Sequence, residues 1–129
     1  MNEESAVLLE QAHQSLRAAE VLLEHGFPGE ASSRIYYGMF YAAQAVLKAL
    51  GIDVHKHSAV SSAFGHHLTA TGKIEARFHR LLINAREIRE HFDYAFEREV
   101  VKPCATVSLD DGRAFVDAME AYLKAEGHV

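Results

Sequence analysis

The placement of two prolines constrains how this chain can fold more than any other feature of its sequence. Pro28 and Pro103 both lie between segments in which apolar residues recur at helical spacing. A proline inside a helix removes a hydrogen bond and clashes with the preceding turn, so the long stretches without proline are free to be helical. The sequence therefore predicts an all-α protein. Because 129 residues can build one ordinary core but not two, we expect one domain over residues 1–129.

Apolar side chains recur every three or four residues along four long segments and one short segment. This pattern predicts an antiparallel four-helix bundle with one additional short helix. Ser58 is suited to cap the short helix and Gly72 to end it, while Ser108 and Asp111 resemble a capping box for the last helix. The expected helices span residues 3–25, 28–50, 58–69, 74–96 and 108–125. The predicted core contains Tyr36, Phe40, Leu47, Leu81, Ile88 and Phe92.

Charge and hydropathy exclude several classes of protein. With 13 Lys and Arg against 18 Asp and Glu, the net charge of −5 leaves no broad basic surface for duplex DNA, so nucleic-acid binding would need a local basic cleft. No run approaches the roughly 20 apolar residues of a membrane span, and the acidic start is unlike a secretory signal. We therefore expect a cytoplasmic protein with no membrane segment. The single cysteine, Cys104, cannot form an internal disulfide.

The segment from Arg34 to Leu47 concentrates aromatic residues, with three tyrosines in six positions. Neighbouring residues on a helix are about 100° apart, so the ring of Tyr36 can enter the core while Tyr37 faces a cleft or a partner. Arg34 lies near the start of the helix, where the helix dipole disfavours a cation. Two interpretations remain open: aromatic core packing with a structural arginine, or a polar site lined by Arg34 and Tyr37.

A second group of charged residues occupies positions 86–94, in the expected fourth helix. Arg89 borders the apolar face of that helix, and Asp93 four residues later is its natural ion-pair partner. The simplest interpretation of this pair is structural.

Three motifs together resemble the HEPN superfamily. They are Arg34-x-Tyr-Tyr-x-x-Phe-x-Ala-Ala in one helix, Gly51-x-x-x-His55 in the connector, and Arg89-x-x-x-Asp93-Tyr94 in a later helix. The resemblance extends from the first expected helix to Tyr94. It implies an antiparallel helical bundle that commonly forms homodimers and is frequently encoded with a minimal nucleotidyltransferase. It also implies a role in toxin-antitoxin or other defence systems.

The same resemblance implies an activity, because many HEPN proteins are metal-independent endoribonucleases with an Arg-x(4–6)-His motif. Arg86 and His91 fit this spacing. In such a site the imidazole takes the proton of a ribose 2′-hydroxyl as it attacks the adjacent phosphate, and the guanidinium binds the charge that grows on the phosphate oxygens. The resemblance thus implies Arg86 and His91 as catalytic residues, with Arg89, Asp93 and Tyr94 as binding residues that support the site.

Three observations leave a non-catalytic interpretation open. On a regular helix Arg86 and His91 are about 140° apart, so they converge only if the helix distorts or a dimer brings two chains together. Arg86 can instead pair with Glu90, and His91 with Glu87, at four-residue spacing. The toxin branch often has a tyrosine two residues after the motif histidine, whereas Tyr94 follows His91 by three. The alternative is a scaffold or binding module, whose polar cleft involves Arg34, Tyr37 and Arg89 and holds nucleotide, RNA or a partner protein without chemistry.

No cofactor and no physiological metal are expected. The histidine pairs at positions 55 and 57 and at positions 66 and 67 lie in the connector and the short helix, where exposed imidazoles bind adventitious metal without function. The sequence also lacks a Gly-rich phosphate loop, a serine nucleophile elbow and a dinucleotide fingerprint. Ordinary nucleotide hydrolases, serine hydrolases and dehydrogenases are therefore excluded as interpretations.

Overall fold

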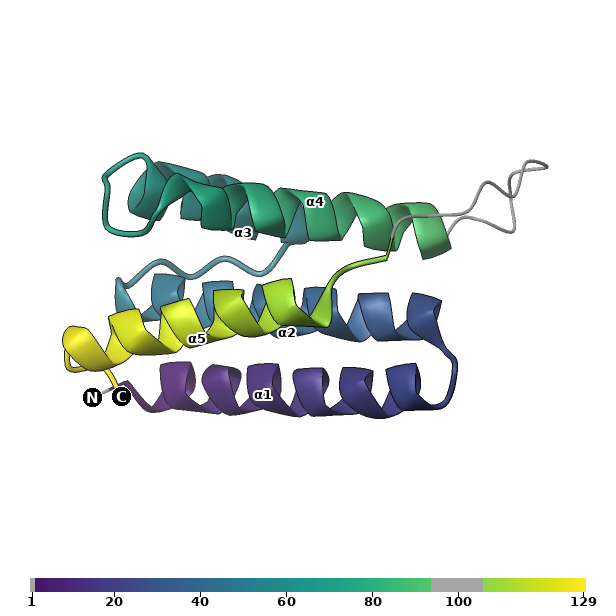
Figure 1. Ribbon diagram of the computed structural model, residues 1–129. Coiled ribbons are helices and arrows are strands. Elements are labelled where there is room, and N and C mark those ends of the chain that lie inside the picture. The colour runs from purple at the N-terminus through teal and green to yellow at the C-terminus, as the bar shows by residue number, and fades with distance from the viewer. Residues whose placement is uncertain (1, 94–105) are drawn as a thin grey trace.

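The computed structural model describes residues 2–93 and 106–129, and it confirms the all-α fold predicted from the helical spacing. Figure 1 shows a bundle in which α2 is packed between α1 and the pair α3 and α4, with α5 alongside. Positions 94–96, the expected end of the fourth helix, lie outside the described residues. The elements are α1 (Glu3–Glu24), α2 (Pro28–Ala49), α3 (His57–Phe64), the π-helical turn η1 (Gly65–Thr69), α4 (Ala76–Asp93) and α5 (Leu109–Ala125).

The central helix is α2, which packs against every other α-helix of the described chain. Glycines stand at two of its contacts with neighbouring helices. Gly38 of α2 faces Leu16 and Ala12 of α1, and Gly112 of α5 lies against Ile35 of α2. A Cβ on Gly112 would lie 2.6 Å from Ile35 Cγ2, well inside the separation at which carbon atoms pack. The two neighbours of α2 therefore approach it at positions where no side chain intervenes.

The ends of two helices test the capping predictions. Ser108 caps α5 as predicted, because its Oγ accepts a hydrogen bond from the backbone N–H of Asp111 at 3.2 Å. The prediction that Ser58 caps the short helix is wrong. In α3 the backbone N–H of Val60 already donates to the carbonyl of Lys56 at 2.9 Å, so helical hydrogen bonding begins before Ser58 and Lys56 is the N-cap residue.

The short helix also differs from prediction at its end, because regular α-helix stops at Phe64 and gives way to η1. Within η1 the backbone N–H of Ala70 donates to the carbonyl of Gly65, five residues back, at 2.9 Å. The imidazole of His79 packs on Gly65, where a Cβ would collide with the ring, and its Nε2 lies 3.0 Å from the carbonyl oxygen of Ser61. The wider turn thus coincides with the place where a side chain of α4 docks against α3.

An aromatic trio joins three helices in the core. Phe64 of α3 and Phe115 of α5 are fully buried, and their ring centroids lie 5.6 Å apart. Phe78 of α4 packs edge-on against Phe115 at 6.0 Å. Edge-on and tilted aromatic pairs contribute beyond the area that they bury. The core also contains three residues placed there by the helical spacing, namely Tyr36, Phe40 and Leu47.

The face that α4 turns to the core was predicted less well. Leu81 and Ile88, expected in the core, are only half-buried, whereas Leu82 and Ala85 are buried. The helix presents the stripe through Leu82 and Ala85 to its neighbours, and Leu81 and Ile88 lie along the edge of this stripe. The side chain of Phe92, also predicted in the core, lies outside the described residues.

Candidate functional site

Four rings from α2 and the first residue of α3 form one contiguous group, which we call the aromatic cluster: Tyr36, Tyr37, Phe40 and His57. Tyr36 and Phe40 are buried, and Tyr37 and His57 are half-buried. The imidazole of His57 stacks on Phe40, with centroids 4.4 Å apart and planes inclined by 15°. The hydroxyl of Tyr36 lies 2.6 Å from His57 Nδ1. The cluster therefore has an apolar base and one polar contact.

Two arginines contact the ring of Tyr37 in this cluster. The guanidinium carbon of Arg34 lies 5.3 Å from the ring centroid of Tyr37, and that of Arg89 lies 5.0 Å from the same centroid. Arg34 Nη2 also donates a hydrogen bond to Ser15 Oγ of α1 at 2.9 Å. Both arginines lie within the range of a cation–π interaction. The structure thus brings together Arg34, Tyr37 and Arg89, three of the residues predicted to line a binding site.

Arg86 lies one turn before Arg89 on α4 and forms an ion pair with Glu90. The distance from Arg86 Nε to Glu90 Oε1 is 3.0 Å, and the two side chains are 31% and 45% exposed. This is the pairing that the four-residue spacing suggested as the alternative to a catalytic role. A half-exposed pair of this kind contributes little to stability, about 0–1 kcal/mol, so its partners can exchange for other charged groups.

The arginines act electrostatically on the pair formed by Tyr36 and His57. Burial raises the pKa of Tyr36 to about 12, although the positive charges of Arg86 and Arg89 oppose this rise. Burial also lowers the pKa of His57, and the charges of Arg89 and Arg86 lower it further against the opposing effect of Glu90. Near neutral pH, Tyr36 therefore keeps its proton and His57 is uncharged.

This lowered pKa predicts a specific loss of stability in mild acid. The unfolded chain binds a proton at His57 more tightly than the folded chain, so the free energy of unfolding falls as the pH drops below the ordinary histidine value of about 6.5. Asp53, whose pKa is lowered by its hydrogen bond with Lys48, titrates at lower pH. Urea unfolding at several pH values between about 7 and 5 should show the loss, and His57→Asn should flatten it. An equal slope in both proteins would contradict this assignment.

His57 is the residue of this site that the sequence analysis missed. The motif resemblance drew attention to His55, but His55 is 75% exposed and its Nε2 lies 3.0 Å from Asp53 Oδ1. His57, two residues later, turns inward onto the aromatic cluster. Nothing in the local sequence distinguishes the two histidines, because the contacts of His57 come from α2, 21 residues away at Tyr36.

The remaining predicted site residues lie at the end of α4. His91 is half-buried in the last turn of the helix. Because α4 runs as uninterrupted α-helix from Ala76 to Asp93, the angular separation of Arg86 and His91 stays near 140°. The side chain of Asp93 and the whole of Tyr94 lie outside the described residues, so the predicted Arg89–Asp93 ion pair and the role of Tyr94 stay predictions.

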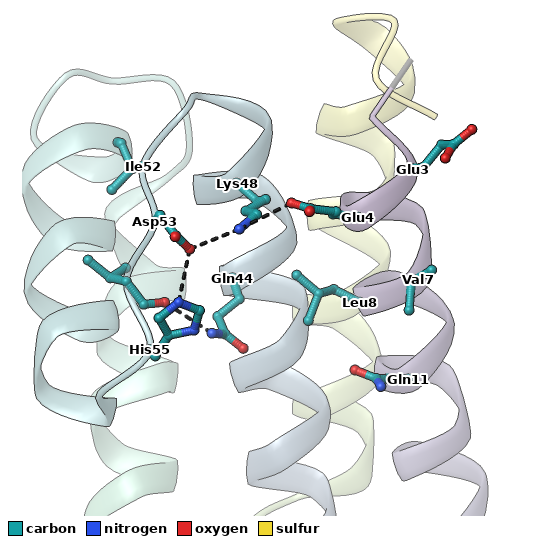
Figure 2. Close-up of a pocket in the computed structure, with 11 residues that line it drawn as sticks. Glu3, Glu4, Val7, Leu8, Gln11, Gln44, Lys48, Ile52, Asp53 and His55 are labelled. Carbon is teal, nitrogen blue, oxygen red and sulfur yellow. Dashed lines mark hydrogen bonds and ion pairs between the residues drawn. The ribbon is translucent and has the colours of Figure 1, made fainter.

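A separate pocket of about 530 Å³ lies between α1, α2 and the connector that follows α2. Figure 2 shows its polar side, where Lys48 Nζ lies 3.1 Å from Glu4 Oε2 and 2.9 Å from Asp53 Oδ1. Hydrogen bonds with Asp53 and Glu4 raise the pKa of Lys48. The apolar side includes Val7, which is 59% exposed, and Leu8. The sequence analysis did not anticipate this pocket, because its walls come from segments more than 30 residues apart along the chain.

Across residues 2–93 and 106–129, no three His, Cys, Asp or Glu side chains gather closely enough to hold a metal ion. None of the helices in that part of the chain combines the length and the apolar character needed to cross a membrane.

Comparison with known proteins agrees with the helical fold. A family model described as the HEPN domain matches residues 5–126. A UPF0332 protein of Gloeobacter violaceus is 42% identical over 94 residues, which cover 73% of this chain and 75% of that protein. A Methanocaldococcus jannaschii protein named "putative toxin" is 34% identical over 116 residues, covering 90% of this chain and 79% of that protein. A second protein of that organism with the same name is 28% identical over 124 residues, covering 96% and 92%.

The family match spans nearly all of α1 to α5, including the aromatic cluster and the arginines of α4. The relatives from both organisms align over more than two thirds of this chain and of their own lengths. This chain therefore belongs to the HEPN domain family, with UPF0332 proteins among its relatives.

Proposed function

We propose that this chain is a toxin-like, metal-independent endoribonuclease. The observation that carries the proposal is the position of Arg86 and Arg89, one helical turn apart, where both act on the His57 imidazole. In a chain with a net charge of −5, these two arginines supply local positive charge for a phosphate, which would bind Arg86 by displacing Glu90 from its 3.0 Å ion pair. Two relatives that carry the name "putative toxin" support a toxin-like role.

In the proposed reaction, His91 and Arg86 are the catalytic residues. The imidazole of His91 accepts the proton of a ribose 2′-hydroxyl as the 2′-oxygen bonds to phosphorus, and Arg86 binds the charge that grows on the phosphate oxygens. The bond from phosphorus to the 5′-oxygen breaks, and a proton from solvent completes the new 5′-hydroxyl. The products are a 2′,3′-cyclic phosphate and a 5′-hydroxyl end. Arg34, Tyr37, Arg89, Asp93 and Tyr94 are the proposed binding residues.

We propose that the active form is a homodimer. Because Arg86 and His91 lie about 140° apart on an uninterrupted helix, one chain does not present both to the same phosphate. Two copies of α4 related by a two-fold axis can place Arg86 of one chain beside His91 of the other. We also propose that the chain is a single domain and acts in the cytoplasm. Its proposed partner in a toxin-antitoxin pair is a minimal nucleotidyltransferase.

The test is incubation of purified protein with total RNA in EDTA, followed by electrophoresis and analysis of the product ends. We expect the wild type to cleave RNA and leave cyclic phosphates, and His91→Ala to lose activity by about 10²–10⁴-fold. His66→Ala is the matched control, because His66 is an exposed histidine of η1, outside the proposed site. Its activity should equal that of the wild type.

A different observation favours a second candidate function. The guanidinium groups of Arg34 and Arg89 both lie over the ring of Tyr37, and such cation–π contacts stabilise a surface without any chemistry. The corresponding function is a nucleotide- or RNA-binding scaffold that acts with the nucleotidyltransferase. If folded, dimeric wild-type protein leaves RNA intact in EDTA, this second function replaces the first.

A further inference from the structure

His57 lies at the centre of the aromatic cluster, yet the proposed cleavage reaction uses only Arg86 and His91. Its ring is fixed on three sides: it stacks on Phe40 at 4.4 Å and on Tyr36 at 5.5 Å, and it meets the ring of Tyr37 edge-on at 5.7 Å. An imidazole held this way has few rotamers left, so the direction of its two ring nitrogens is set before any ligand arrives.

One of those nitrogens is already occupied. His57 Nδ1 lies 2.6 Å from the hydroxyl of Tyr36, within hydrogen-bond distance. With Tyr36 protonated and His57 uncharged near neutral pH, the tautomer of the imidazole decides the direction of this bond: either the phenol donates to Nδ1, or Nδ1–H donates to the phenol oxygen. A neutral imidazole that accepts at Nδ1 carries its proton on Nε2.

The other nitrogen is available for a ligand. His57 is half-buried, and within residues 2–93 and 106–129 no protein group forms a hydrogen bond with Nε2. Arg89 lies beside the same rings as His57, because its guanidinium carbon is 5.0 Å from the centroid of Tyr37 and 5.9 Å from that of Tyr36. The charges of Arg89 and Arg86 act on the imidazole, and the charge of Glu90 opposes them. An N–H donor in the field of two cations is a site for an anion with oxygen acceptors, and a phosphate diester has this chemistry.

We infer that His57 is a phosphate-contacting residue, which donates its Nε2 proton to an RNA phosphate held between it and the arginines of α4. Tyr36 is the positioning residue, because its hydroxyl holds the imidazole in the tautomer that donates. This inference rests on the proposed RNA substrate but not on cleavage, since the contact serves binding as well as catalysis.

Two substitutions separate the two nitrogens of the imidazole. The side-chain amide of Asn reaches the position of Nδ1, so His57→Asn keeps a partner for the Tyr36 hydroxyl and loses the donor at Nε2. The amide of Gln reaches the position of Nε2, so His57→Gln keeps a donor there. The probe is a fluorescent RNA oligonucleotide with 2′-O-methyl groups, which cannot be cleaved. A hydrogen bond to a charged acceptor predicts that His57→Asn binds it about tenfold more weakly, and that His57→Gln stays within about threefold of the wild type.

Nuclear magnetic resonance of the histidine ring nitrogens gives a readout that a purely structural role would not move. We expect the wild type to carry the His57 proton on Nε2, and its pKa to rise when the oligonucleotide binds, because an adjacent anion favours the charged ring. Tyr36→Phe keeps the stacked ring and removes the hydroxyl. In this variant the proton should divide between the two nitrogens, with weaker oligonucleotide binding.

The outcomes separate this inference from the proposed cleavage. A wild type that binds the oligonucleotide through His57 but does not cleave RNA would support the inference and overturn the nuclease. The inference alone would be overturned if the wild type cleaves RNA and His57→Asn binds the oligonucleotide as tightly as the wild type does. The same holds if the wild type cleaves RNA and His57→Gln binds as weakly as His57→Asn. A proton on Nδ1 would also overturn it, and a wild type with no affinity for the oligonucleotide would overturn both.

Discussion

Replacing Phe115 with alanine is expected to lower the free energy of unfolding by about 3–5 kcal/mol, the range for truncating a buried phenylalanine. Phe115 is fully buried and its ring contacts Phe64 at 5.6 Å and Phe78 at 6.0 Å, so the substitution removes the aromatic contact that joins α5 to α3 and α4. Urea unfolding followed by far-ultraviolet circular dichroism measures the change. Should the alanine variant fail to fold, Phe115→Leu leaves a smaller cavity and is expected to lose less.

The matched control for this experiment is Phe27→Ala, which makes the same truncation at a phenylalanine that is 51% exposed. Its effect should stay within about 0.5 kcal/mol, as for most surface substitutions. Similar losses at both positions would mean that the buried position of Phe115 adds nothing to stability, and would contradict the packing described for α3, α4 and α5.

Arg86→Ala is expected to reduce the rate of RNA cleavage by about 10²–10³-fold, the usual effect of removing one group that stabilises charge in a transition state. Its stability should change by less than about 1 kcal/mol, because the substitution breaks only the half-exposed ion pair with Glu90. Arg86→Lys keeps the charge but loses the planar guanidinium that matches two phosphate oxygens, so its activity should fall between that of the wild type and that of Arg86→Ala. Single-turnover cleavage of a labelled RNA measures all three proteins.

Arg77→Ala provides the comparison within the same helix. Arg77 also pairs with a glutamate, Glu75, at 3.1 Å, and is 54% exposed. Like Arg86→Ala, the substitution removes one positive charge and breaks one ion pair, but it does so outside the proposed site. Equal losses of activity in the two variants would assign the effect to overall charge and exclude a specific role for Arg86.

Much of the fold was predictable because its determinants are local in sequence. The helices follow from apolar spacing and from the positions of Pro28 and Gly26, and the Ser108 cap follows from a hydroxyl three residues before an exposed N–H. The Arg86–Glu90 pair likewise follows from four-residue spacing on one helix.

What could not be predicted depends on contacts between distant segments. The rotation of α4 that buries Leu82 in place of Leu81 depends on how the helix docks, and the η1 turn coincides with His79 docking on Gly65. The role of His57 has the same origin, because its partner hydroxyl belongs to α2. A short polar connector contains no periodic pattern from which the inward-facing histidine could be identified.

The Arg86–Glu90 pair also bears on how the protein would discriminate among polyanions. Glu90 serves as an internal counterion, so a phosphate that binds Arg86 exchanges one anion for another. Fewer small ions are released than the number of arginines suggests, and affinity should decline less steeply with salt than it does for an uncompensated basic patch. Weak, non-specific polyanions then gain little from this site, while a ligand that also contacts His57 and Arg89 can displace the carboxylate.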